Sequence, residues 1–324
     1  MLTPRELFRR FPLRHSAQIQ KFRNEIRSLV HGKSNRIAII VGPCSLHNTE
    51  EVLEYARRLK TLSDQIQDRA LIVMRAYFEK PRTTVGWKGL VYDPDLDGTH
   101  NLEKGLLATR ALLLQLSELG LPLAAEFLDP NIAPYLSDLI SWGVIGSRSC
   151  TSQIHRQLAS NLPLPVGIKH GTEGSLDCAL NAMIAAGSSH HFFGIDEQGV
   201  LSAQSSHGNP DTHLIMRGSR HGPNFEADAI AEAHSLLQKR NLQNRLLIDC
   251  SHGNSGKDHT KQPEVFANIM KQIRGGNRQI LGVMLESHLH EGKKLSLTDS
   301  CIGWETTEKL LLNEFHPHLL TPVS

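Results

Sequence analysis

Polar side chains that can do chemistry follow short apolar stretches throughout this sequence. Eight such stretches, each three to five residues long, carry a polar residue at or just after their end. In chain order, these polar residues are Cys44, Arg75, Glu126, Arg148, Lys169, Arg217, His252 and Glu286. One polar residue at the end of a strand is often no more than a salt-bridge partner. Eight in succession, four of them basic, indicate a shared site.

Residues 70–89 hold the densest part of this pattern. Apolar residues 71–74 predict a buried strand, and the strand end and the loop after it contribute three cations and a hydroxyl group, namely Arg75, Lys80, Arg82 and Thr83. Pro81 lacks a backbone donor and keeps this loop out of helical geometry. Cations and a hydroxyl group at the end of a strand suit an oxyanion such as a phosphate or a carboxylate.

The basic residues of the whole set supply more positive charge than one phosphate group requires. They are Arg75, Lys80, Arg82, Arg148, Lys169 and Arg217. Two anionic substrates, or one substrate with both a phosphate and a carboxylate, would use this charge. The candidate metal ligands are Cys44, His252 and Glu286, with Asp299 as a possible fourth. A mixed set of this kind favours a catalytic divalent transition metal over a structural zinc site.

Several familiar binding motifs are incomplete. Residues 93–98 resemble the start of an EF-hand loop, but its twelfth position is Lys104 instead of Glu. No Gly-x-Gly-x-x-Gly follows an apolar stretch, so a dinucleotide cofactor has no support. His288 and His290 flank Leu289 and could bind a metal, although we expect them to be an exposed loop pair.

The alternation of apolar stretches with amphipathic segments predicts an α/β fold. The predicted strands are residues 37–41, 71–74, 123–127, 144–146, 166–168, 214–216, 246–248 and 282–285. Predicted helices between them include residues 50–62, 101–119, 132–142, 175–186 and 227–240. Eight strands that alternate with helices favour a (β/α)8 TIM barrel, in which the ends of the strands meet at one face. Residues 191–195 and 200–203 predict a β-hairpin inserted before strand 6.

Two domains or segments are expected: a helical arm over residues 1–35 and the catalytic barrel over residues 36–324. The candidate buried residues of the arm are Leu7, Phe8, Phe11, Ile19, Phe22, Ile26 and Leu29. This pattern predicts an arm that packs on the barrel or on a partner subunit.

The composition argues against nucleic-acid and membrane partners. Across 324 residues, 35 Lys and Arg balance 33 Asp and Glu, which gives a net charge of +2. No apolar run approaches the roughly 20 residues of a membrane-spanning helix. Five Cys form no Cys-x-x-Cys pair, so we expect no disulfide framework and a cytoplasmic location.

The segments around these residues resemble the class I 3-deoxy-D-arabino-heptulosonate 7-phosphate (DAHP) synthases. The most specific are Gly42-Pro43-Cys44-Ser45 and the block from Glu79 to Gly89. Others are Glu126-Phe127-Leu128-Asp129, Ser251-His252, Glu286-Ser287-His288-Leu289 and Cys301-Ile302-Gly303-Trp304. The resemblance extends from about residue 5 to residue 310.

This resemblance implies a metal-dependent transferase of the shikimate pathway. It would condense phosphoenolpyruvate with erythrose 4-phosphate and water, and release DAHP and phosphate. The implied metal ligands are Cys44, His252, Glu286 and Asp299, for Mn2+, Fe2+, Co2+ or Zn2+. The implied phosphoenolpyruvate contacts are Arg75, Lys80, Arg148, Lys169 and Arg217, and the implied erythrose 4-phosphate contacts are Arg82 and Thr83. Relatives of this kind are usually dimers or tetramers, so a homo-oligomer is expected.

Three residues are candidates for catalysis beyond binding. Lys80 is close to several cations, so we expect a depressed pKa and a role in proton transfer. Glu126 would orient the attacking water, and His252 would act as a metal ligand.

The sequence departs from the family in places that bear on acceptor choice and regulation. The loop from Lys293 to Leu297 is short, His170 replaces the usual Asn, and residues 149–151 differ from the usual Thr-Thr-Glu. Around the expected effector pocket, several residues are unusual: Pro130, Ala133, Pro134, Pro163 and Gly194. The chain also begins roughly where the effector-binding extension of regulated relatives would end. We therefore expect weak or absent feedback by Phe or Tyr.

Two alternatives remain open. A related condensation of phosphoenolpyruvate with a different aldose would serve a specialised pathway, although the presence of Arg82 and Thr83 argues mildly against it. A silent paralogue that regulates a partner would be expected to lack a ligand or a cation, and none is missing.

Overall fold

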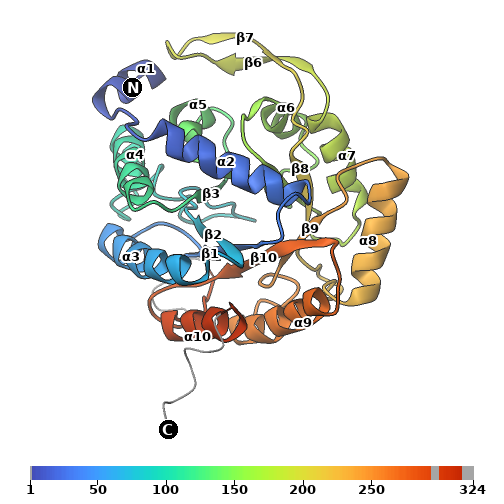
Figure 1. Cartoon of the computed structure of the whole chain (residues 1–324). Coiled ribbons are helices and arrows are strands. Elements are labelled where there is room, and N and C mark those ends of the chain that lie inside the picture. Colours follow the sequence, from blue (N-terminus) through green and yellow to red (C-terminus); the bar gives the residue numbers. More distant parts are fainter. Residues whose placement is uncertain (1, 293–298, 316–324) are drawn as a thin grey trace.

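Eight parallel strands close into a barrel in the computed structural model, which describes residues 2–292 and 299–315 (Figure 1). The strand order around the barrel is β1-β10-β9-β8-β5-β4-β3-β2. The strands are β1 (Ile37–Gly42), β2 (Ala70–Arg75), β3 (Leu123–Glu126), β4 (Trp142–Ile145), β5 (Val166–Lys169), β8 (Thr212–Met216), β9 (Leu246–Asp249) and β10 (Ile280–Glu286). The predicted (β/α)8 barrel is confirmed.

Helices surround the barrel and connect most of its strands (Figure 1). They are α3 (Thr49–Ile66), α4 (Leu102–Glu118), α5 (Ala133–Leu136), α6 (Gln153–Asn161), α7 (Asp177–Ala186), α8 (Ala227–Lys239), α9 (Gln262–Arg274) and α10 (Trp304–Phe315). Two short 3-10 turns, η1 (Ser137–Leu139) and η2 (His259–Lys261), accompany α5 and α9. None of the helices within the described ranges is long and apolar enough to cross a membrane.

One predicted helix, residues 132–142, is confirmed only in part. Only α5 and η1 are helical there, and the chain is extended at Ile140 before β4 begins at Trp142. The side chain of Trp142 is fully buried among residues of the barrel interior. Because that position requires an extended backbone, tertiary packing overrides the local helical pattern.

The N-terminal segment forms α1 (Pro4–Arg10) and α2 (Ser16–Val30), and α2 crosses the barrel (Figure 1). Ile26, Leu29 and Val30 of α2 share one buried cluster with barrel residues, among them Val73 and Ile215. The segment therefore packs on the barrel, one of the two predicted arrangements. Of the residues predicted to be buried, four are so and three are only half-buried: Phe8, Phe11 and Phe22. The domain division after residue 35 stays a prediction.

An antiparallel hairpin precedes the sixth strand of the barrel, as predicted. It consists of β6 (His190–Ile195) and β7 (Leu201–Ser206), which pair only with each other. Figure 1 shows the hairpin outside the barrel, near α1 and α6.

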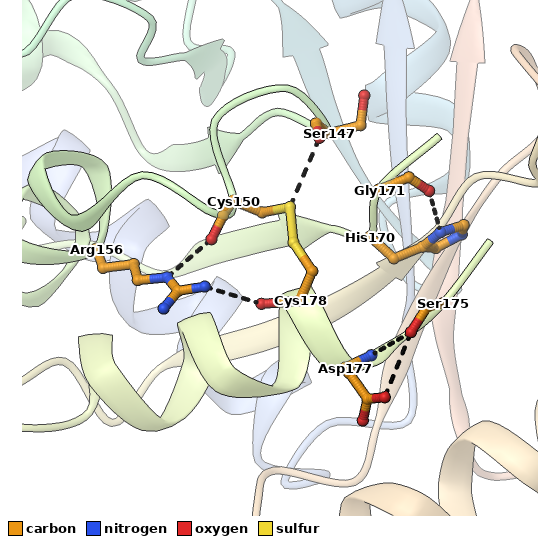
Figure 2. Close-up of a disulfide and its surroundings, with 8 residues drawn as sticks. All are labelled: Ser147, Cys150, Arg156, His170, Gly171, Ser175, Asp177 and Cys178. Carbon is orange, nitrogen blue, oxygen red and sulfur yellow. Dashed lines mark hydrogen bonds between the residues drawn. A yellow bond between two sulfur atoms is a disulfide. The ribbon is translucent and has the colours of Figure 1, made fainter. Parts of the chain in front are cut away.

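A single disulfide bond joins Cys150 to Cys178 (Figure 2), a pairing that the sequence analysis did not predict. Cys150 lies in the loop between β4 and α6, and Cys178 in the first turn of α7. The Arg156 guanidinium donates hydrogen bonds to the backbone oxygens of both cysteines, at 2.8 and 3.5 Å. The pairing depends on the contact between α6 and α7, and a separation of 28 residues in the sequence carries no motif for it.

Candidate functional site

A cavity of about 350 Å³ lies at the carboxyl ends of the barrel strands. All six predicted cations line it: Arg75, Lys80, Arg82, Arg148, Lys169 and Arg217. Thr83, Glu126, His252, Glu286 and Asp299 line it as well. The structure thus brings every predicted site residue to one place, since Cys44, which is not part of the lining, lies directly behind Lys80.

Three of the four predicted metal ligands form a tight group. The ligand atoms of Cys44, Glu286 and Asp299 lie within 4.8 Å of one another, and Cys44 Sγ is 3.7 Å from Asp299 Oδ2. His252 Nε2 lies beside this group, 3.9 Å from Glu286 Oε1. A thiol, two carboxylates and an imidazole suit a divalent transition metal, so the residues present fit the ion that the family implies.

The charge state of Cys44 supports this fit. The Cys301 thiol donates a hydrogen bond to Cys44, and Lys80 and Arg75 add positive charge, so the pKa of Cys44 is well below its usual value. The thiolate is the form of cysteine that binds metals. In return, the same hydrogen bond and burial raise the pKa of Cys301.

The expectation of a depressed pKa for Lys80 is wrong. Burial and Arg75 lower the pKa of Lys80, but the negative charges of Cys44 and Glu286 outweigh them and raise it. Its Nζ donates to Cys44 Sγ at 3.0 Å and to the backbone oxygen of Cys44 at 3.1 Å. Lys80 is therefore an ammonium ion, which can give up a proton to a substrate but cannot accept one.

Two buried arginines keep donors free for an anion. Arg75 donates to Glu286 Oε1 at 2.9 Å, and both side chains are almost fully buried. Arg75 NH1 and Arg217 Nε are buried and have no hydrogen-bond partner among the described residues. Because a buried donor without a partner is costly, these nitrogens indicate an anion as the missing acceptor.

Asp249 positions two of the predicted residues, although we did not predict it as a site residue. Its Oδ2 accepts from Lys169 Nζ at 2.8 Å and lies 2.9 Å from His252 Nδ1. Burial alone would raise the pKa of Asp249, but Lys169 and His252 hold it well below its usual value. Asp249 thereby turns His252 Nε2 toward Glu286, as partners of metal-binding histidines commonly do. Asp249 is the last residue of β9, and this position at a strand end could have marked it as a site residue.

The backbone at His252 is unusual, with a φ of 54°. Left-handed backbone is uncommon for a residue with a side chain and is concentrated at functional sites. Gln262 holds the backbone of Glu286: its Oε1 accepts from the Glu286 N–H at 2.9 Å, and its Nε2 donates to the Glu286 carbonyl oxygen at 3.1 Å.

The loop over residues 79–89 folds back on itself at the rim of the cavity. Lys80 N donates to Lys88 O at 2.8 Å, and Arg82 Nε donates to Trp87 O at 2.6 Å. Thr83 Oγ1 accepts from Arg148 at 3.0 Å. This hydrogen bond links a predicted erythrose 4-phosphate contact to a predicted phosphoenolpyruvate contact. Gly89 permits the turn, because its φ is +120° and an added Cβ would lie 2.2 Å from Phe78 O.

Glu126 is at the end of β3 and is 6% exposed. Gly146, at the end of the neighbouring strand, leaves the room that the carboxylate occupies. A Cβ at Gly146 would lie 2.1 Å from Glu126 Oε1. A side chain at residue 146 would therefore displace the Glu126 carboxylate from its present position.

His170, a departure from the family pattern, has a clear structural role. Its Nε2 accepts the Arg217 N–H at 3.1 Å, and Asn224 Nδ2 lies 2.9 Å away. Burial lowers the pKa of His170 to about 4, so the ring stays neutral and can accept. His170 thus fixes the backbone that carries Arg217.

Sequence reasoning missed several residues that line the cavity. They are Tyr77, Ser147, Ser255, Lys257, His259 and Gln262. Half of them, Ser255, Lys257 and His259, lie between β9 and α9, where no apolar periodicity marks a functional residue. The short loop noted before Asp299, residues 293–298, lies outside the described residues.

Comparisons with known proteins show the family to which this chain belongs. Residues 14–316 match the profile of the DAHP synthetase I family. The Tyr-sensitive phospho-2-dehydro-3-deoxyheptonate aldolase of Escherichia coli K12 is 46% identical over 98% of this chain and 93% of its own length. The Trp-sensitive enzyme of the same strain is 45% identical over 96% of this chain and 93% of its own length.

Solved structures agree as well. The phospho-2-dehydro-3-deoxyheptonate aldolase of Francisella tularensis SCHU S4 superimposes with a TM-score of 0.94 at 40% identity, over 97% of this chain and 96% of that one. A Thermotoga maritima enzyme of the same name, at 22% identity and a TM-score of 0.58, shares the fold; the match covers 87% of this chain and 68% of that one. By both sequence and structure, this chain belongs to the DAHP synthetase I family.

Proposed function

We propose that this protein condenses phosphoenolpyruvate with erythrose 4-phosphate and water to give DAHP and phosphate. The observation that carries the proposal is the joint lining of one cavity by six cations and by His252, Glu286 and Asp299, with the Cys44 thiol directly behind Lys80. This arrangement suits two anionic substrates and one metal ion, which is what the reaction requires. The names of its relatives support the same reaction.

The cations divide between the two substrates in this proposal. Phosphoenolpyruvate is bound by four buried cations, Arg75, Lys80, Lys169 and Arg217, and by the exposed Arg148. Arg82 and Thr83, on the rim loop, bind the phosphate of erythrose 4-phosphate. The unpartnered donors of Arg75 and Arg217 support an anion at the deeper position. Fixing both substrates brings C3 of phosphoenolpyruvate to the aldehyde carbon, which is catalysis by proximity.

The candidate metal ligands are Cys44, His252, Glu286 and Asp299. A divalent ion held there would supply Lewis-acid polarisation of the aldehyde oxygen. The candidate ions are Mn2+, Fe2+, Co2+ and Zn2+. The supply of each metal in the cell decides which of them binds, as well as the ligands.

Lys80 and Glu126 handle protons in this proposal. As the new C–C bond forms, the aldehyde oxygen gains negative charge, and the Lys80 ammonium donates a proton to it. Water adds to C2 of the phosphoenolpyruvate unit, and Glu126 orients that water and accepts its proton. Phosphate then leaves from C2. The raised pKa keeps Lys80 in the protonated form that a donor requires.

We also propose that Phe and Tyr inhibit this enzyme weakly or not at all. The unusual residues Pro130, Ala133, Pro134, Pro163 and Gly194 support this, whereas the two relatives from Escherichia coli are named for sensitivity to Tyr and to Trp. Turnover measured against a series of amino-acid concentrations tests the proposal. Inhibition by micromolar Phe or Tyr would contradict it.

Consumption of phosphoenolpyruvate in the presence of erythrose 4-phosphate tests the reaction itself. We expect turnover that stops with EDTA and returns with Mn2+. A protein that binds metal and phosphoenolpyruvate but consumes none with this aldehyde would overturn the proposed acceptor. A dimeric or tetrameric state and a cytoplasmic location stay predictions, the first of which light scattering can test.

A further inference from the structure

Three side chains that the proposed reaction does not use lie close together outside the lining of the cavity. They are His47, Glu51 and His288. His47 lies in the loop between β1 and α3, Glu51 in the first turn of α3, and His288 just after β10. The sequence suggested an exposed pair at His288 and His290, but His288 is only 3% exposed.

The spacing of these groups fits one metal ion better than a hydrogen bond. One ligand atom from each residue lies within 4.8 Å of the other two. His288 Nε2 and Glu51 Oε2 are 3.6 Å apart, which is too long for a hydrogen bond. Two ligands bound to a tetrahedral ion at about 2.0–2.1 Å are separated by about 3.4 Å.

Buried polar atoms in this cluster lack partners. Glu51 Oε2 and His288 Nδ1 are both buried without a hydrogen bond among the described residues. A carboxylate oxygen in that state is costly unless a cation meets it. The His288 side chain is 4% exposed, so water has little access to it.

Hydrogen bonds with neighbouring backbone groups fix the positions of His47 and His288. His47 Nδ1 lies 3.2 Å from the Ser45 carbonyl oxygen. A carbonyl only accepts, so Nδ1 carries the proton and Nε2 keeps its lone pair for a metal. The backbone N–H of His288 donates to Ile302 O at 2.9 Å, and that of Ser287 donates to Gly42 O at 2.9 Å. His288 is thereby fixed between two segments of the barrel.

We propose that His47, Glu51 and His288 form a second metal site, which binds a borderline divalent transition ion such as Zn2+. Two imidazoles and one carboxylate are a zinc-binding set that leaves a fourth position for water. The ion joins the loop that carries Cys44 to the segment that follows Glu286. It therefore braces two of the candidate ligands of the first metal without touching the substrates.

The number of Zn2+ ions bound per chain tests this proposal independently of turnover. Metal-free protein is dialysed against low micromolar free Zn2+, and the bound metal is measured by elemental analysis. We expect two ions per chain in the wild type and one in Glu51→Gln. We also expect one in the double variant Cys44→Ser/Asp299→Asn, and none when all three substitutions are combined. His47→Gln is a second variant of the same site, in case Glu51→Gln folds poorly.

Glu50→Gln is the matched control, because Glu50 is its exposed neighbour on the same turn and has the same charge. It should keep both ions. One ion in the wild type, or two ions retained in Glu51→Gln, would overturn the second site. Neither result would bear on the proposed condensation, which depends on Cys44 and its partners.

Discussion

The inward faces of the barrel strands are apolar at the amino-terminal end of the barrel and charged at the carboxyl end. Along β2, the inward residues Leu71 and Val73 are apolar, and the next residue on that face is Arg75. β8 repeats the change, from Ile215 to Arg217, within one period of the strand. At the amino-terminal end, α2 covers the apolar residues, whereas the carboxyl end is left open and charged.

This difference separates stability from chemistry along the barrel axis. Apolar burial at one end contributes free energy of folding. The other end buries charges, which do not stabilise a fold efficiently. The free energy of folding from apolar burial at the covered end therefore offsets the cost of burying charges at the open end. Substitutions at each end should give distinct results, and the following four are ordered from the largest expected effect to the smallest.

Cys44→Ala should have the largest effect, and it should fall on activity alone. We expect turnover to drop at least about 1000-fold, roughly 4 kcal/mol of transition-state free energy, because the proposed metal loses its thiolate. Turnover, bound metal and the unfolding temperature are measured together. A variant that keeps its metal and its activity would remove Cys44 from the proposed ligand set.

Leu29→Ala should have the converse effect at the covered end. Leu29 is fully buried in α2, so its truncation should cost about 2–5 kcal/mol of unfolding free energy. Denaturant unfolding measures this cost, and activity per folded molecule should stay within about twofold. Gln20→Ala, on the exposed side of α2, is the control and should change stability by less than about 0.5 kcal/mol. Equal losses of activity and stability would contradict the separation of the two ends.

His213 makes the covered end sensitive to acid. Burial lowers the pKa of His213 to about 4 from an ordinary value of 6.5. The unfolded chain therefore takes up a proton first, and stability falls as the pH drops from about 6.5 to about 4, by up to about 3 kcal/mol. His213→Gln should flatten this dependence in denaturant unfolding across that range.

The exposed residue His207 provides the control for this measurement. His207→Gln should leave the pH dependence as it is in the wild type. His170, at the open end, has a pKa lowered in the same direction, so some acid sensitivity will remain in His213→Gln. An unchanged curve in that variant would contradict the prediction, because it would mean that the pKa of His213 is the same in the folded and the unfolded protein.

Gly146→Ala should have the smallest effect, confined to the open end. An added Cβ meets Glu126 Oε1, so the carboxylate must move away from the proposed water. We expect kcat/KM to fall about tenfold, about 1.4 kcal/mol, with little change in unfolding. Gly171→Ala, where an added Cβ has nothing within 4 Å, should behave like the wild type. Equal activity in the two variants would argue against a role for Glu126.

The barrel and the residues of the cavity could be predicted because both follow local rules. Short apolar stretches such as residues 71–74 form buried strands, and parallel strands bring their ends together. The features that escaped prediction depend on contacts between distant segments. Trp142 is extended because the barrel interior receives it, and Cys150 meets Cys178 because α6 packs on α7. The pKa of Lys80 rises because of the negative charges at Cys44 and Glu286, which residue type alone does not reveal.

The closure of the barrel also sets an order for folding during synthesis. Ala38 of β1 pairs with Gly282 of β10, and the apolar residues of α2 share one buried cluster with Leu281 and Met284 of the same strand. Because α2 precedes β10 by about 250 residues, it leaves the ribosome well before β10 and waits for that strand before its own packing is complete. Contacts between such distant parts of a chain form slowly. The apolar face of α2 is thus a surface that a chaperone would have to shield until β10 has been made.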